Sequence, residues 1–278
     1  MAIKKTIYFD TFTAIESTDY IGIDGSLKSV GDLAVQGKQI LIDGIVAGMG
    51  QVMVNGSESV KVNGFFDGHG NTFITTGDFT TSSTSSLTGQ NVQLFVKNNI
   101  EHNGKIISDQ NTLIKLENGN FEKVKGGLSS GGWVAFDGEL NSDEVLKLVT
   151  GNEGTISAQW IQVVTTEPVI INRNIEKTNE ISIGAKSISL DSGKSINAES
   201  VTLSSSAGDV TLNSGTSITG TNSVTISAQG GNLIREGKLV NGKPVFSSIL
   251  AGNGGVQLET NGTYIDQASL TKTSEPWW

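Results

Sequence analysis

The residues best suited to chemistry in this sequence are two histidines, His69 and His102. His69 lies in Gly68-His69-Gly70, a loop setting where a histidine could act as a base or bind a metal. A catalytic histidine would also need a carboxylate partner in space. A histidine between glycines is more often an exposed turn residue, and we predict that role for His69.

Aspartate and asparagine recur at equivalent positions, as Asp43 with Asn63 and as Asp191 with Asn213. Such columns could bind calcium or sugar hydroxyls. The more common arrangement is a hydrogen-bonded ladder that holds successive turns in register. We therefore predict a corner ladder at these four positions, no catalytic residue and no cofactor, with calcium as the alternative.

Other metal and nucleotide sites lack their motifs. The chain has no cysteine, which excludes thiolate metal sites and disulfides. Calcium nonapeptide repeats, phosphate-binding loops and zinc-ligand spacings are also absent. With a net charge of −9 and two arginines, Arg173 and Arg235, the chain lacks the cations that nucleic-acid binding needs.

The N-terminal sequence gives an expectation about localisation. Met1 to Lys5 resembles the start of a signal peptide, but no apolar stretch follows it. No run approaches the ~20 apolar residues of a membrane span. We predict an extracellular or cell-surface protein that uses a route without a classical signal peptide. A cytoplasmic or virion location is the alternative.

Two pairs of internal repeats indicate the elements that position these residues. Residues 31–50 align with 51–68 at an offset of 19 or 20, and 187–208 align with 209–230 at 22 or 23. Within each repeat, apolar and polar residues alternate, and Asn-Gly or Asp-Gly pairs separate the segments. Repeats of near-constant length predict an all-β chain, a parallel β-helix with coils of about 20–23 residues.

The alignment of the second pair predicts which side chains point inward and stack. Ile188 should lie against Val210, and Ile196 against Ile218. The predicted stacked core positions are Ile188, Leu190, Ile196, Val201, Leu203, Val210, Leu212, Ile218, Val224 and Ile226.

We predict a single domain over residues 1–278, in four parts. These are an N-terminal cap or edge strand (1–30), a first repeat block (31–98), an irregular middle (99–180), and a second repeat block with a C-terminal cap (181–278). The middle contains one short helix over 141–151, with Asn141 or Ser142 as its cap and an apolar stripe at Val145, Leu148 and Val149.

Three further segments depart from the repeat. The Ser/Thr-rich stretch 72–89 and the stretch 233–249, which contains Pro244, are predicted to be excursions from the stack. The last two residues, Trp277 and Trp278, could cap the end of the stack or contact a partner.

Three stretches carry a family resemblance: GTISAQ at 154–159, GDVTLNSG at 208–215 and VTISAQGGNL at 224–233. They resemble the haemagglutinin-type repeats of filamentous haemagglutinin, two-partner-secreted adhesins and contact-dependent inhibition proteins. The resemblance implies a right-handed parallel β-helix that forms an adhesive shaft outside the cell. The chain lacks the NPNG motif and the signal peptide of those proteins. It is also similar to the β-helical tips of phage tails and type VI secretion systems.

These observations favour a non-catalytic function. We expect a structural or adhesive β-helix module of a bacterial or phage surface assembly, which self-associates as a filament subunit or contacts other surface proteins. One alternative is a carbohydrate-active β-helical enzyme, a polysaccharide lyase or hydrolase. Another is a glycan-binding protein like a phage tailspike, and a third is an intracellular scaffold.

Overall fold

The computed structural model confirms the fold class. It describes residues 1–119, 121, 123–150, 155–177 and 179–267. Strands make up 64% of the structure, which has one short helix and forms a parallel β-solenoid of about 11 turns. The chain divides into two compact units. Unit 1 contains Met1–Glu139 and Gly151–Gln159, and unit 2 contains Leu140–Thr150 and Trp160–Trp278.

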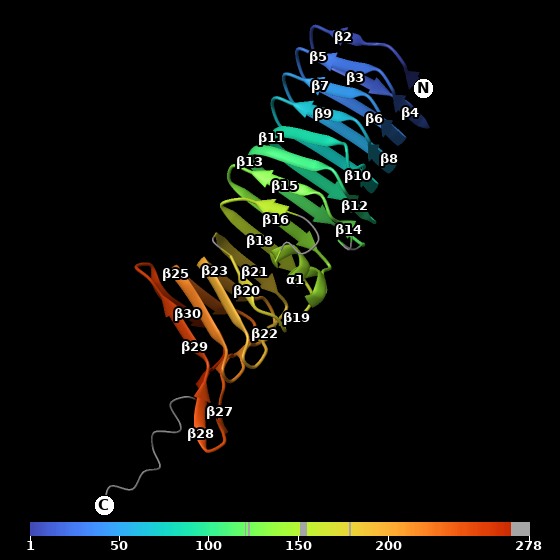
Figure 1. Cartoon of the computed structure of the whole chain (residues 1–278). Coiled ribbons are helices and arrows are strands. Elements are labelled where there is room, and N and C mark those ends of the chain that lie inside the picture. Colours follow the sequence, from blue (N-terminus) through green and yellow to red (C-terminus); the bar gives the residue numbers. More distant parts are fainter. Residues whose placement is uncertain (120, 122, 151–154, 178, 268–278) are drawn as a thin grey trace, which may run out of the picture. The chain divides into compact units, whose positions relative to one another are not determined.

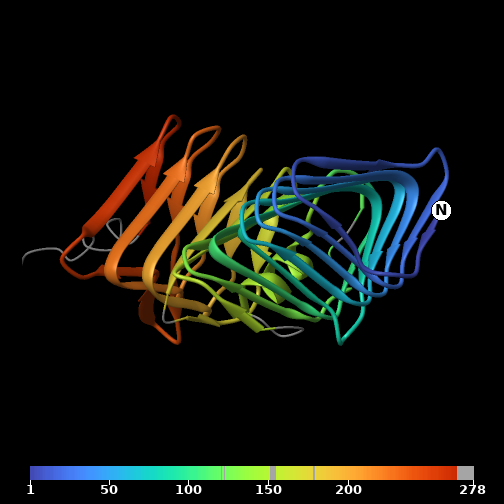
Figure 2. The same ribbon diagram turned by 90° about the horizontal axis from the view of Figure 1, so that it is seen from above.

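Unit 1 is a stack of three-sided coils whose outlines nearly superpose in the blue-to-green part of Figure 2. The strands of the first side are β1 (Ala2–Ile3), β4 (Tyr20–Ile23), the second halves of β6 (Leu33–Ile42), β8 (Val52–Val62) and β10 (Thr72–Thr81), then β12 (Ile100–His102) and β14 (Lys123–Val124).

The other two sides of unit 1 continue the same coils (Figure 1). The second side contains β2 (Ile7–Phe9), β5 (Ser26–Ser29), β7 (Ile45–Gly48), β9 (Phe65–Gly68), the first halves of β11 (Ser86–Val96) and β13 (Lys105–Leu116), β15 (Gly127–Ser130) and β17 (Thr155–Ser157). The third side contains β3 (Thr13–Glu16), the first halves of β6, β8 and β10, the second halves of β11 and β13, and β16 (Trp133–Gly138).

The register in unit 1 follows the sequence repeat. Leu33 lies opposite Val52, and Ile40 lies opposite Val60, so the offset grows from 19 to 20 at an irregularity just after Gly37. Close approach of successive coils explains one glycine at the corners. A Cβ on Gly44 would overlap the carbonyl oxygen of Gly25 in the coil before, so a larger residue there would push the coils apart.

Unit 2 is a second three-sided stack. Its first side contains β18 (Trp160–Thr165), β21 (Glu180–Ala185), the second halves of β23 (Ser195–Ser205) and β25 (Ser217–Ala228), and β30 (Gly255–Thr260). Its second side contains β19 (Val169–Ile171), β22 (Ile188–Leu190), β24 (Val210–Leu212), β26 (Leu233–Arg235) and β31 (Tyr264–Asp266). Its third side contains β20 (Ile175–Glu176), the first halves of β23 and β25, and β29 (Ser248–Ala251).

The core of unit 2 consists of inward columns of aliphatic side chains. Ile188 pairs with Val210, Leu190 with Leu212, and Ile196 with Ile218, as the repeat alignment predicts. Val201 pairs with Val224, and Leu203 with Ile226. Every one of these ten side chains is at most 1% exposed. Each aliphatic side chain buried in this way contributes roughly 1.5–3 kcal/mol of hydrophobic stabilisation.

Helix α1 (Ser142–Thr150) begins at a capping box. The side-chain oxygen of Asn141 accepts hydrogen bonds from the backbone N–H groups of Asp143 (3.0 Å) and Glu144 (3.1 Å). The Glu144 carboxylate in turn accepts the Asn141 N–H at 2.9 Å. Val145 and Val149 of α1 are buried, and the helix packs within unit 2 against β18, β19 and β20.

The Ser/Thr-rich stretch 72–89 is a regular part of the stack, so the predicted excursion there is wrong. β10 and β11 take up the stretch except for the turn 82–85. Thr72 and Thr76 occupy inward positions and are buried. Their hydroxyls donate to the carbonyl oxygens of Thr88 and Asp78, both at 2.9 Å, which satisfies them inside the core.

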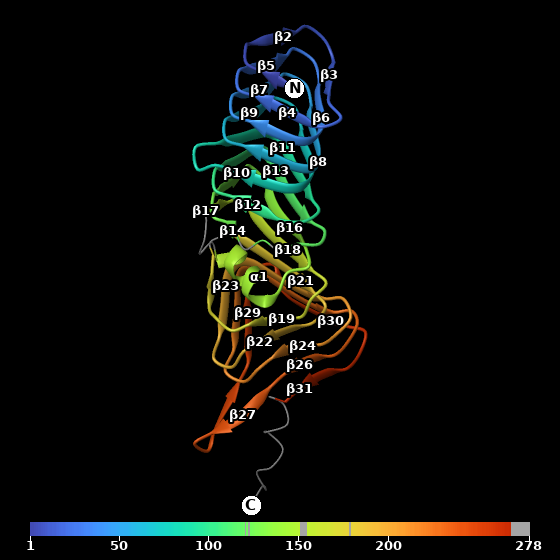
Figure 3. The ribbon, with the colours of Figure 1, turned by 90° about the vertical axis from the view of Figure 1, so that its right-hand side faces the viewer.

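The stretch 233–249 does leave the stack. It forms an antiparallel hairpin of β27 (Gly237–Val240) and β28 (Lys243–Phe246), which projects beside the last coils of unit 2 in Figure 3. The turn places Asn241 at φ 53° and Gly242 at φ 76°. Two successive positive φ values are the geometry of a two-residue hairpin turn, which asparagine and glycine adopt readily.

The N-terminal segment is built into the stack as its first coil and two sides of its second. β2 pairs in parallel with β5, and β3 pairs in parallel with β6. Residues 1–30 therefore continue the coil geometry of the repeat block. Trp277 and Trp278 lie outside the described residues.

Candidate functional site

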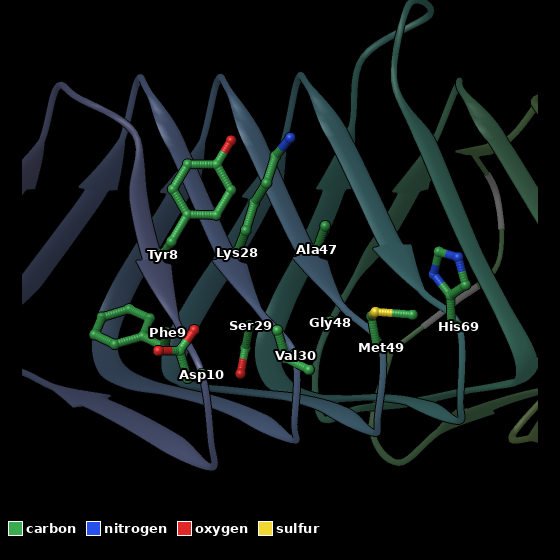
Figure 4. Close-up of a pocket in the computed structure, with 10 residues that line it drawn as sticks. All are labelled: Tyr8, Phe9, Asp10, Lys28, Ser29, Val30, Ala47, Gly48, Met49 and His69. Carbon is green, nitrogen blue, oxygen red and sulfur yellow. The ribbon is translucent and has the colours of Figure 1, made fainter.

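The most distinctive surface of unit 1 is the outside of its second side. We call it the lateral face. It consists of the outward side chains of β2, β5, β7 and β9, with the corner residues that follow these strands: Asp10, Val30, Met49 and His69. A pocket of about 210 Å³ opens on it, shown in Figure 4. That volume is far more than the ~10–15 Å³ that a single water molecule requires.

One small residue in an outward column, Ala47, lines the pocket. Tyr8, Lys28, Ala47 and Asp67 follow one another in register along β2, β5, β7 and β9. Ala47 is the smallest of the four, so the column is hollowed between Lys28 and Asp67. Figure 4 shows Tyr8 and Lys28 on one side of this hollow and His69 at its far end.

The lateral face exposes large apolar side chains. Met49 is 62% exposed, Val30 60% and Tyr8 70%. Phe65, two residues before Asp67 on β9, is 57% exposed. Single exposed apolar residues are ordinary, but several on adjacent coils of one face mark an interaction surface.

Charged groups are interspersed among these apolar residues. The Lys28 ammonium lies 5.7 Å from the centre of the Tyr8 ring, within range of a cation–π contact. The Asp67 carboxylate accepts a hydrogen bond from the Thr88 hydroxyl at 2.6 Å. Its other oxygen lies 3.8 Å from Nδ1 of His69. The face therefore has a cation on the second coil and an anion on the fourth, with Ala47 between them.

The two histidines lie in opposite environments. His69 is an exposed corner residue, the role predicted from its glycine neighbours. His102 is fully buried inside unit 1. Its Nδ1 lies 2.9 Å from the Thr81 hydroxyl, and its Nε2 lies 3.4 Å from the carbonyl oxygen of Gly127. The Thr81 oxygen already accepts N–H bonds from Asn103 and Gly104.

This network fixes the protonation state of His102. With its oxygen accepting two N–H bonds, the Thr81 hydroxyl donates its proton to Nδ1, which must then be unprotonated. Burial lowers the pKa of His102 from 6.5 to about 4, although the hydrogen bond to the Gly127 carbonyl acts in the opposite direction. His102 is therefore neutral at neutral pH and acts as a core residue that links three coils.

The predicted corner ladder forms at one of its two places. The Asn63 amide donates to the Asp43 carboxylate at 2.7 Å across adjacent coils. The Asn213 amide instead donates to the carbonyl oxygen of Leu190 (2.9 Å) and to the Ser189 hydroxyl (3.1 Å). Asp191 and Asn213 still occupy equivalent turns, but the Asn213 amide donates its hydrogen bonds to a backbone carbonyl and a hydroxyl group of the preceding coil and not to Asp191.

A longer ladder lies at another corner of unit 1, and the sequence analysis missed it. The Asn91 amide donates to the side-chain oxygen of Asn71 at 2.9 Å, and the Asn111 amide donates to that of Asn91 at 3.1 Å. The Asn111 oxygen then accepts the backbone N–H of Trp133 at 3.2 Å. The spacing of 20 between these asparagines, which equals the coil period, was the available signal.

We expect Asn91→Ala to destabilise unit 1 by about 1–2 kcal/mol, because it removes the middle rung and leaves both neighbouring amides short of a partner. Urea unfolding followed by circular dichroism measures the loss. The matched control is Gln90→Ala, at the adjacent exposed position, which should change the unfolding free energy by no more than about 0.5 kcal/mol. Equal effects of the two changes would contradict a role for the ladder in stability.

Over the described ranges, no group of three or more histidine and acidic side chains gathers where it could hold a metal ion. No helix in that part of the chain is long and apolar enough to cross a membrane. No family model, curated protein or solved structure matches the chain. The candidate site is therefore interpreted from its own geometry.

Proposed function

We propose that this chain is a structural or adhesive β-solenoid module of a bacterial or phage surface assembly, and that its lateral face makes contact with a partner. The observation that carries the proposal is the exposure of Tyr8, Val30 and Met49 on a face whose inward residues are fully packed. The fold gains nothing from large apolar side chains there, whereas an interface does.

The repeats add support for the setting outside the cell. The stretches at 208–215 and 224–233, which resemble haemagglutinin-type repeats, form β24 and β25 with their flanking turns in unit 2. In the proposed function each unit acts as a spacer, and neither catalysis nor a cofactor is required. We propose an extracellular or cell-surface location.

A second candidate is glycan binding, with or without cleavage. It is favoured by the exposed Tyr8 ring beside Lys28, and by the His69 imidazole, which lines the same pocket. An apolar platform with a few polar groups around it is typical of small-ligand sites.

One set of measurements separates these candidates. Cell fractionation with protease treatment of intact producing cells should place the protein at the surface, and the purified chain should bind cell or particle surfaces. A glycan panel tests the second candidate, together with an assay for newly released reducing or unsaturated ends. Protection from external protease combined with absence of surface binding would contradict the proposed function, and release of sugar ends would replace it with an enzymatic one.

A further inference from the structure

We propose that the lateral face is a self-complementary interface, on which two copies of this chain pair face to face with their stacking directions antiparallel. This inference rests on the proposed function and names the partner of the same face. The occupant is a second copy because the charges of the face complement the face itself.

The order of charges along the stack carries the argument. Lys28, Ala47 and Asp67 occupy the same outward column on three successive coils. Neighbouring coils are about 4.8 Å apart, so the lysine and the aspartate are roughly 10 Å apart, with Ala47 midway. When a second copy of this column is placed against the first in the opposite direction, each lysine faces an aspartate and the two alanines face each other.

Two faces of identical copies can meet around a two-fold axis that lies in the plane between them. If the axis runs along the strands and passes through Ala47, the coil order is reversed. Lys28 of each copy then lies against the partner's Asp67, which makes two ion pairs. Ala47 meets the partner's Ala47 on the axis, where its small size lets the two faces approach closely.

The alternative two-fold axis runs along the stack and keeps the coil order. It would place Lys28 against the partner's Lys28, and Asp67 against the partner's Asp67. Like charges in direct contact at an interface cost several kcal/mol. The charge pattern thus selects the antiparallel pairing and disfavours the parallel one.

The apolar residues of the face agree with the same axis. Ile45, Ala47 and Met49 all belong to the coil through which the axis passes. Each therefore meets its own counterpart in the partner. Met49 is 62% exposed in the single chain and would be covered in the pair. The apolar centre with charges outside it is the usual arrangement of a protein interface.

The size of the face sets the expected affinity. Four coils at about 4.8 Å and one short strand with its corner give a contact of roughly 20 Å by 20 Å. This lies at the small end of specific interfaces. We therefore expect a weak dimer, with a dissociation constant in the micromolar range.

A cysteine cross-link tests the position of the axis directly, because the chain contains no cysteine. In the Met49→Cys variant the two thiols of a pair lie close to the axis, so mild oxidation should give a disulfide-linked dimer. Met53→Cys, on a different side of the coil and 37% exposed, is the matched control and should stay monomeric. Cross-linking of both variants to the same extent, or of neither, would overturn the proposal.

Charge reversal tests the pairing itself, by sedimentation equilibrium over a micromolar concentration series. Lys28→Glu and Asp67→Lys should each weaken the dimer by at least about tenfold, because each creates two like-charge contacts. The double variant Lys28→Glu/Asp67→Lys should recover an affinity near that of the native chain. Lys61→Glu, which reverses an exposed lysine on the first side, should leave the affinity unchanged.

These outcomes separate the inference from the proposed function. A native chain that stays monomeric throughout the series, or a double variant that does not recover, overturns the antiparallel pair. If such a chain still binds cell or particle surfaces, the proposed function stands with a different partner. Thermal melts of all variants, followed by circular dichroism, show whether a loss of dimer reflects loss of fold instead.

Discussion

Ile218→Asp should unfold unit 2 or destabilise it by more than about 4 kcal/mol. Ile218 is 0% exposed and lies in an inward column, between Ile196 on one coil and Ile249 on the next. An aspartate there would have an uncompensated charge among aliphatic side chains, or would have to take up a proton to avoid it. Few single substitutions cost this much, and a buried unpaired charge is among the mechanisms that do.

The matched control is Thr211→Asp, on the neighbouring strand β24. Thr211 points outward between Ser189 and Ile234, so the same charge would stay in water. We expect a cost of no more than about 1 kcal/mol, from the low strand preference of aspartate. Urea unfolding monitored by circular dichroism compares the two. Similar losses in both variants would mean that the inward and outward positions are wrongly assigned.

The second large effect is a loss of stability on acidification that depends on His102. In the unfolded chain this histidine takes up a proton near pH 6.5, whereas in the folded chain it does so only near pH 4. Between these values the unfolded state binds more protons, so stability falls as the pH falls from about 6.5 to about 4. The full difference of the two pKa values corresponds to roughly 3 kcal/mol.

The measurement is the free energy of unfolding at a series of pH values for the native chain and two variants. His102→Gln should be less stable at neutral pH, but it should lose less stability than the native chain over this window. His69→Gln, which removes the exposed histidine and keeps His102, is the matched control, and its stability should follow that of the native chain over the same pH series. If the free energy of unfolding of His102→Gln fell with pH as steeply as that of the native chain, His102 would not be the cause of the acid destabilisation.

The fold could be predicted from the sequence because every coil of a solenoid repeats a similar pattern of inward and outward residues at a near-constant spacing. Val201 and Val224 match in the alignment for the same reason that they pair in the sheet: each coil must return to the same place. The stretch 72–89 was misinterpreted because Thr72 and Thr76 look like loop residues by composition. Their burial depends on carbonyl oxygens supplied by the surrounding backbone, which the sequence does not display.

The candidate site was less accessible from the sequence. Tyr8, Ala47 and Asp67 belong to three coils, and nothing in their local sequences marks them as neighbours. Their outward column could have been assembled by extending the 19- or 20-residue offset to Tyr8 and Lys28. The repeat alignment over residues 31–68 indicates the inward residues and the corners, whereas Tyr8 and Lys28 lie outside the aligned range.

The hairpin of β27 and β28 shows that a coil of this fold can contain extra residues without a change in its pairing with the neighbouring coil. Ile196 pairs with Ile218, which lies 22 residues later in the chain. Ile218 pairs in turn with Ile249, and here the separation is 31 residues. The same inward column continues through both pairs. The extra residues left the coil at a corner without disturbing the pairing on either side. Such a corner is a natural place to insert foreign peptides, because a guest sequence there would extend sideways while the host stack kept its spacing.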